Sequence, residues 1–94
     1  MNGRVDAIRP SRRLDLTIRE LDGEMVILDR QAGLVHQLNR TASCIWEACD
    51  GSATPAELAE VVARTFDVDP NTAAEDVAAA VAQLQKLSLL KADA

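Results

Sequence analysis

The chain has 94 residues and a formal net charge of −5 at pH 7, with 10 basic against 15 acidic residues. This length accommodates one small domain with a thin core, and it leaves no room for separate substrate and cofactor domains. No apolar run approaches the roughly 20 residues that a membrane span requires, and the N-terminus lacks the apolar stretch of a secretory signal. We therefore expect a cytoplasmic protein, and the acidic residues 51–94 disfavour a nucleic-acid partner.

The first residues differ in character from the rest of the chain. Residues 1–12 show no sustained hydrophobic period, contain Pro10 and mix charges, so we expect them to form a flexible N-terminal arm. Arg12 and Arg13 are expected to lie in solvent, with a contact to acidic groups of a partner as the alternative. Residues 13–91 are expected to form a single domain.

Two strands joined by a tight turn are predicted next. Leu14, Leu16 and Ile18 alternate with polar residues, which predicts a strand from about Leu14 with one buried and one solvated face. The Asp-Gly pair at 22–23 is a hairpin-turn signal. Residues 25–28 are apolar on both faces, as in a central strand, and their outer face has no evident partner.

The hydrophobic period changes at Asn39 from that of a strand to that of a helix. Residues 34–38 alternate in character, as side chains do when they point to opposite faces of a sheet. From Ala42 to Cys49 the apolar residues fall at helical spacing. Asn39 is a favourable N-cap, since its side-chain oxygen can accept a backbone N–H of the first turn. The Asp-Gly pair at 50–51 is expected to end this helix, because glycine readily takes the left-handed conformation.

Two further helices are predicted in the acidic C-terminal half. The threonine, proline and glutamate within residues 54–57 combine an N-cap, a first-turn proline and a capping box. For the last helix two start signals compete, the Asp-Pro pair at 69–70 and the Thr-x-x-Glu box at 72–75. Its apolar stripe consists of Ala73, Val77, Ala80, Val81, Leu84 and Leu87. Residues 89–90 favour a short extended segment.

In chain order these predictions give three strands followed by three helices. Short turns between consecutive strands make an antiparallel meander, and helices that follow the sheet in sequence point to the α+β class. The last two helices together resemble a helix-turn-helix. We therefore expect an α+β fold with a three-stranded antiparallel sheet followed by three helices.

Side chains that carry catalysis or bind metals are scarce. The serines lack a nucleophile motif, no glycine-rich phosphate loop is present, and the only histidine, His36, has no visible acid partner. Cys44 and Cys49 lie on different sides of one predicted helix, and a metal site would need further ligands. We expect no catalytic residue, no metal site and no cofactor. Trp46 is expected to anchor the core, with a role as a ligand platform as the alternative.

A set of cap and core positions extends over about residues 14–90. It comprises Leu38, Asn39, Thr41, Ala42, Ile45, Asp50, Gly51, Thr54, Asp76, Val77, Leu84 and Leu89. The ordered combination is Leu-Asn-x-Thr-Ala, then Asp-Gly, then a threonine-capped helix. At these spacings the chain resembles the PqqD family of peptide chaperones, also called RiPP precursor recognition elements.

The resemblance implies a small winged-helix-like domain without catalysis. Members of this family bind the leader segment of a ribosomally made precursor peptide. They hand it to a modifying enzyme, such as a radical SAM protein, or to a leader peptidase. The leader adds as an extra strand to the third strand, in a groove walled by the third helix. The partners that the resemblance implies are therefore a precursor leader peptide and one such enzyme, with no nucleic acid and no membrane.

The residues agree with strand addition. Residues 34–38 form the last strand of the meander, so they can lie at an edge with free N–H and C=O groups; such an edge also permits a homodimer. On the third helix, small Ala80 leaves room for a leader side chain, and Asp76 and Gln83 offer polar contacts. The peptide-binding residues that we predict are Leu34, Val35, His36, Gln37, Leu38, Asp76, Ala80, Gln83 and Leu87.

Two positions depart from the family pattern. Members commonly have glycine just before the final leucine, where this chain has Ser88, so the third helix is expected to run longer or to end less sharply. Members associated with lasso peptides often carry aromatic residues before the Gln-Leu-Asn segment, where Val35 and His36 stand here. The pathway and the leader motif are therefore left open.

Other classes of function compete with peptide binding. A winged-helix DNA-binding transcription regulator would insert one helix of the last pair into a DNA groove. Against it, the third helix opens with Glu75 and Asp76 and carries only Lys86 as a base. A structural or regulatory subunit would instead dock on an enzyme through the outer face of the sheet. A small enzyme is the least favoured class, since the sequence shows no acid, base and nucleophile in a catalytic arrangement.

Overall fold

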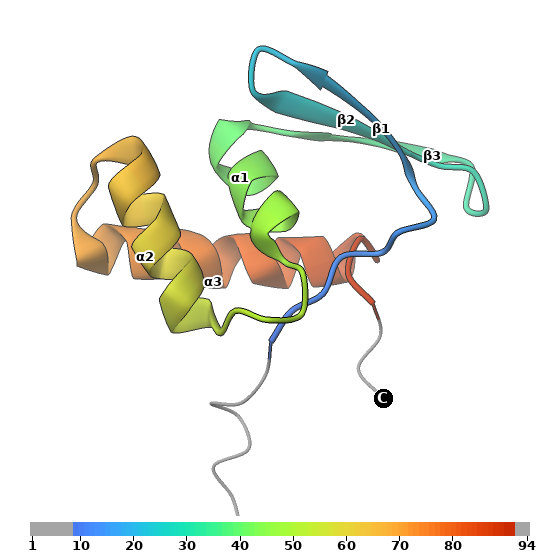
Figure 1. Ribbon diagram of the computed structural model, residues 1–94. Coiled ribbons are helices and arrows are strands. Elements are labelled where there is room, and N and C mark those ends of the chain that lie inside the picture. Colours follow the sequence, from blue (N-terminus) through green and yellow to red (C-terminus); the bar gives the residue numbers. More distant parts are fainter. Residues whose placement is uncertain (1–8, 92–94) are drawn as a thin grey trace, which may run out of the picture.

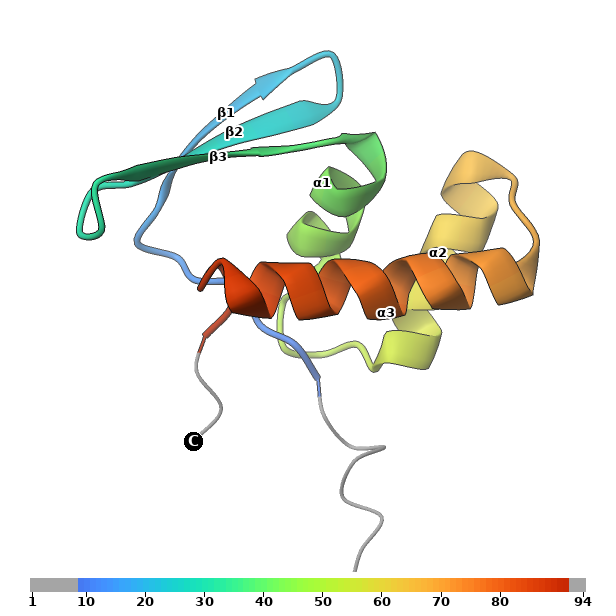
Figure 2. The same cartoon turned by 180° about the vertical axis from the view of Figure 1, so that it is seen from behind.

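The computed structural model describes residues 9–91, in which a three-stranded sheet lies over three helices (Figure 1). Strands β1 (Thr17–Leu21), β2 (Glu24–Asp29) and β3 (Leu34–Leu38) pair antiparallel in the order β1-β2-β3. Helices α1 (Arg40–Ala48), α2 (Pro55–Phe66) and α3 (Pro70–Lys86) follow. All of them lie on one side of the sheet, as the view from behind also shows (Figure 2). The predicted α+β architecture is confirmed.

A two-residue turn joins β1 to β2. Asp22 and Gly23 have φ angles of 56° and 82°, the left-handed pair that a type I′ turn requires. Leu21 and Glu24 pair across the turn. The hairpin signal in the sequence is therefore confirmed.

The prediction for the first strand is wrong in its start and in its burial. β1 begins at Thr17 and not at Leu14, and all five of its residues are exposed. Leu14 itself is 73% exposed, while Leu16 packs against the core. The physical reason is that no helix lies beneath β1, since no Cα atom of α1, α2 or α3 lies within 8 Å of one of its Cα atoms.

The segment before β1 is ordered along residues 9–12. Within the arm expected over residues 1–12, the described part is paired with the rest of the domain at two positions, and residues 1–8 lie outside the described residues. Ser11 and Arg12 form isolated antiparallel bridges with residues that follow α1 and α3. Bridges of single residues have no hydrophobic period, so the sequence pattern could not predict them.

Arg12 and Arg13 are anchored, which corrects the expectation that they lie in solvent. Arg13 Nη1 donates to Asp29 Oδ2 at 2.9 Å, and Arg13 Nη2 donates to Asp15 Oδ2 at 2.8 Å. The hydrogen bond from Arg13 is the main cause that holds the pKa of the buried Asp29 carboxyl below its usual value. Arg12 lies 5.8 Å from the centroid of the Trp46 ring, within the range of a cation–π contact.

Trp46 anchors the core, as the sequence predicts. Its exposed fraction is 1%, and its Nε1 donates to the carbonyl oxygen of Leu89 at 2.9 Å. This hydrogen bond ties α1 to the segment that follows α3. The other buried apolar residues are Met25, Ile27, Leu38, Ile45, Cys49, Leu58, Val62, Ala73, Val77, Leu84, Leu89 and Leu90.

The helices begin where short-range signals place them. Asn39 Oδ1 accepts the N–H of Ala42 at 2.8 Å, and Thr54 with Glu57 forms a complete capping box. Of the two start signals for α3, the earlier is correct, because the Asp69 carboxylate accepts two backbone N–H groups of the first turn. Each signal depends on residues within one turn of the cap, which explains why the sequence predicts it well.

The end of α3 is sharp, so the expectation of a longer or less defined end is wrong. Leu89 N donates to Leu84 O at 2.9 Å, and Ser88 N donates to Gln85 O at 3.0 Å. These are the two hydrogen bonds of a Schellman motif. Ser88 has a φ of 60°, so serine occupies the left-handed position where glycine is the usual residue.

Replacing Ser88 by glycine is expected to raise the free energy of unfolding by about 0.5–1 kcal/mol. A left-handed backbone costs a residue with a Cβ atom roughly 1–2 kcal/mol, and the larger unfolded-state freedom of glycine offsets part of that gain. Urea denaturation of both proteins measures the difference. Ser88→Ala is the matched control, since alanine keeps the Cβ atom; an equal gain from alanine would show that the backbone conformation is not the cause.

Candidate functional site

β3 is an edge strand of the sheet. β2 pairs with one side of it, and within residues 9–91 no strand pairs with the other side. In an antiparallel pair, successive residues alternate between those that exchange hydrogen bonds with the partner strand and those whose N–H and C=O groups point away. Alternate residues of β3 therefore direct their backbone groups to the free edge.

The hydrogen bonds of Ser43 in α1 show which residues of β3 direct their backbone groups to β2 and which to the free edge. The N–H of Met25 donates to Ser43 Oγ at 3.0 Å, and the same hydroxyl donates to the carbonyl oxygen of Leu38 at 3.1 Å. Met25 and Leu38 are also partners in the β2–β3 register. Their backbone groups therefore point toward each other, with the buried hydroxyl between them.

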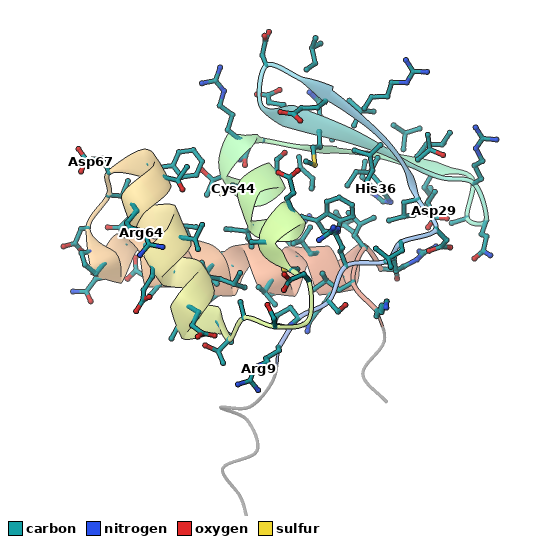
Figure 3. The ribbon with its side chains drawn as sticks, viewed as in Figure 1. Arg9, Asp29, His36, Cys44, Arg64 and Asp67 are labelled. Atoms are coloured by element: carbon teal, nitrogen blue, oxygen red, sulfur yellow. The ribbon has the colours of Figure 1, made fainter. Side chains whose placement is uncertain are left out.

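Alternation back along β3 from this pair assigns the whole strand. Leu34, His36 and Leu38 direct their N–H and C=O groups to β2 and their side chains to the helices. Figure 3 shows the His36 side chain on the helix side of the sheet, and His36 pairs with a fully buried isoleucine of β2. Val35 and Gln37 direct their backbone groups to the free edge and their side chains to the outer face.

A groove lies between the end of β3, the first turn of α1 and the middle of α3. Its volume is about 450 Å³. α3 packs against α1 and α2, and no Cα atom of α3 lies within 8 Å of a Cα atom of β3, so the space beside this edge is open. The lining residues are Leu38, Asn39, Thr41, Ala42, Asp76, Ala79, Ala80, Gln83 and Leu84.

The groove brings together four of the nine residues predicted to bind peptide, and these are Leu38, Asp76, Ala80 and Gln83. The other residues of β3 lie along the edge and do not line the groove, with Leu34 51% and Val35 65% exposed. Leu87 does not line the groove either; its side chain is partly buried and packs against the core. His36 is half-buried, and its Nε2 atom is buried without a hydrogen-bond partner among the described residues.

Five further residues of the lining were not among the predicted site residues, and one of them, Leu84, is a buried core residue of α3. Asn39, Thr41 and Ala42 belong to the motif that caps α1, which sequence reasoning interpreted only as scaffold. Ala79 lies one residue from Ala80 on α3. Its position three residues after Asp76 was the available signal, because residues at this spacing share a helix face.

A second groove, of about 420 Å³, lies on the other side of α1, beneath the β1–β2 turn. Its lining residues are Glu20, Asp22, Gly23, Met25, Arg40, Ser43, Cys44, Glu47 and Phe66. The guanidinium of Arg40 is engaged here, since its Nε donates to the carbonyl oxygen of Asp22 at 2.9 Å. None of the predicted site residues lies in this groove.

The two thiols are poorly suited to nucleophilic chemistry. Burial raises the pKa of Cys49 to about 11, and burial also raises the pKa of Cys44. Both thiols are therefore protonated near neutral pH, whereas the thiolate is the reactive form. In the described part of the chain, no group of three or more histidine, cysteine, aspartate or glutamate side chains is arranged to hold a metal ion. No helix in the same range combines the length and the apolar composition needed to cross a membrane.

Comparison with protein families gives one match. The family model described as coenzyme PQQ synthesis protein D (PqqD) matches residues 24–90, which include β2, β3 and all three helices. The matched range also contains the groove and the free edge of β3. A search of curated proteins finds no match.

Three solved structures share the fold. Lasso peptide synthetase B1 complexed with the leader peptide has a TM-score of 0.74 and 27% sequence identity, over 89% of this chain and 99% of that chain. TbiB1 in complex with the TbiA(beta) leader peptide has a TM-score of 0.74 and 24% identity, over 89% and 98%. The PqqD truncation of Methylobacterium extorquens PqqCD, a stand-alone RiPP recognition element, has a TM-score of 0.69 and 20% identity, over 95% and 99%.

Proposed function

This chain belongs to the PqqD family, and from that premise we propose that it is a non-catalytic peptide chaperone. It binds the leader segment of a ribosomally synthesised precursor peptide, which adds as a fourth strand to the free edge of β3. The observation that carries the proposal is that, within residues 9–91, no strand pairs with the N–H and C=O groups that Val35 and Gln37 direct to the free edge, beside an open groove. Both leader complexes among the similar structures support the same kind of ligand.

Hydrogen bonds at the edge account for part of the affinity. Val35 and Gln37 offer two N–H and two C=O groups, and a hydrogen bond contributes about 0.5–1.5 kcal/mol net. Their sum is roughly 2–6 kcal/mol, whereas a micromolar dissociation constant corresponds to about 8 kcal/mol. The groove must therefore contribute the remainder through leader side chains. Backbone hydrogen bonds form with a leader of any sequence, so they contribute affinity without specificity. The groove, which contacts leader side chains, determines which sequences bind.

The bound leader leaves other surfaces free for an enzyme. Val26 and Leu28 of β2 are half-buried and lie in the outer-facing rows of the sheet, next to exposed Val35. We propose that the complex presents its peptide to a modifying enzyme, such as a radical SAM protein, or to a leader peptidase. A homodimer formed by pairing two β3 edges would occupy the leader site, so dimerisation of this kind and leader binding exclude each other.

Fluorescence polarisation tests the proposed function. The probe is the labelled leader of a short peptide encoded beside this protein, and a labelled DNA duplex is the control. We expect saturable binding of the leader at micromolar or lower concentration. Binding of the duplex with a steep dependence on salt, and none of the leader, would favour the transcription regulator instead.

A further inference from the structure

One charged side chain faces the groove. Among the described residues that line it, Asp76 is the only ionisable one. Its side chain is partly buried, and within residues 9–91 it forms neither an ion pair nor a hydrogen bond. A carboxylate in this setting loses water when a ligand covers it, and that loss is unfavourable unless the ligand supplies a partner.

The wall around Asp76 is formed by small and apolar side chains. Ala79 and Ala80 lie within about one helical turn of it, and Leu38 lines the opposite side of the groove. Gln83 lies seven residues further along α3, about 10 Å by helix geometry. A long unbranched side chain fits over the two alanines, with its apolar stem against them and its polar end at Asp76.

The sheet register identifies the leader residue that enters this space. Residues directly opposite each other on neighbouring strands share a face of the sheet. The side chain of Leu38 faces the helices and lines the groove. A leader residue paired with Leu38 therefore projects its own side chain into the groove.

Building on the proposed function, we propose that Asp76 selects a leader with lysine or arginine at the position that pairs with Leu38. The stem of that side chain lies on Ala79 and Ala80, and its cation forms a charge-assisted hydrogen bond with the carboxylate of Asp76. An apolar or acidic leader residue there leaves Asp76 covered and unpaired, so it is rejected.

Selection from a displayed library of random peptides of about a dozen residues tests this inference. The baits are the parent protein, Asp76→Asn, Asp76→Lys and the control Glu75→Gln, which removes the neighbouring charge outside the groove lining. We expect the parent and the control to enrich lysine or arginine at one fixed position. Asp76→Asn is expected to lose that preference, and Asp76→Lys is expected to replace it with aspartate or glutamate.

Affinity measurements on one selected peptide complete the test. Asp76→Asn is expected to bind a peptide with lysine at that position about tenfold or more weakly than the parent. It is expected to bind the norleucine analogue more tightly than the parent does, because covering a neutral amide costs less than covering an unpaired carboxylate. Nuclear magnetic resonance of the Val35 and Gln37 amides distinguishes a failure of selection by Asp76 from a failure of strand addition at β3. Peptides that perturb these amides without any preference dependent on Asp76 would overturn the inference and leave the proposed function intact. If no selected peptide perturbs them, both the inference and the proposed function are wrong.

Discussion

Replacing Gln37 by proline is expected to weaken leader binding at least tenfold while the sheet stays folded. The N–H of Gln37 points to the free edge, so proline removes a donor to the guest strand and no hydrogen bond to β2. Tenfold corresponds to about 1.4 kcal/mol, the order of one lost hydrogen bond, and the proline ring adds a steric obstacle at the edge. Fluorescence polarisation with the labelled leader measures the change, and circular dichroism checks the fold.

The opposite edge of the sheet offers a matched control. Leu21 and Glu24 close the two-residue turn and exchange hydrogen bonds, so alternation directs the backbone groups of Ile18 to the free edge of β1. Ile18→Pro therefore makes the same chemical change at an edge that the leader does not use, and its affinity should match that of the parent. If Gln37→Pro folds and also binds like the parent, strand addition at β3 is wrong.

Replacing Trp46 by alanine is expected to lower the free energy of unfolding by about 3–5 kcal/mol. Trp46 is 1% exposed, so its removal leaves a large cavity between the sheet and the helices. It also leaves the carbonyl oxygen of Leu89 without the indole donor at 2.9 Å. Domains of this size have a total stability of roughly 5–15 kcal/mol, so the loss is a large fraction of the whole. Urea denaturation measures it.

Trp46→Phe separates a core role from a role in ligand binding. Phenylalanine keeps a ring in the core but removes the N–H donor, which should cost about 1–3 kcal/mol. Leader affinity of the folded variant should stay within about twofold of the parent. Val26→Ala, on the outer face of the sheet, is the control with a smaller expected loss. A Trp46→Phe protein of unchanged stability that no longer binds the leader would show that the indole is a ligand platform.

The parts of the fold that the sequence predicts correctly depend on neighbouring residues. The Asn39 cap, the capping box of Thr54 and the turn at Asp22 each involve groups within a few residues of each other. The errors concern contacts between distant segments. Hydrophobic periodicity does not predict that β1 lacks a helix beneath it. It also does not predict the hydrogen bonds of Arg13 with Asp29 and with the backbone at the end of α3.

The candidate site also has one part that the sequence predicts, the edge of β3, and one part that depends on contacts between distant segments, the wall formed by α3. Strand order places β3 at an edge, and the alternation of a strand is local, so this half of the site could be derived from the sequence. Which side of α3 faces the groove depends on how that helix packs on α1. Sequence alone therefore does not show that Ala79 lines the groove while Leu87, which packs against the core, lies outside the lining. The hydrogen bonds of the Ser43 hydroxyl with Met25 and Leu38 join residues far apart in the sequence, and no sequence motif predicts them.

Hydrogen exchange of individual amides, with and without the labelled leader, tests strand addition most directly. Strand addition should make saturating leader slow the exchange of the Val35 and Gln37 amides, whose N–H groups point to the free edge. The amides of His36 and Leu38, already directed to β2, should change little, and Ile18 on the far edge should not change. If the leader binds saturably while the Val35 and Gln37 amides exchange as fast as in the unbound protein, the leader does not add as a strand to β3.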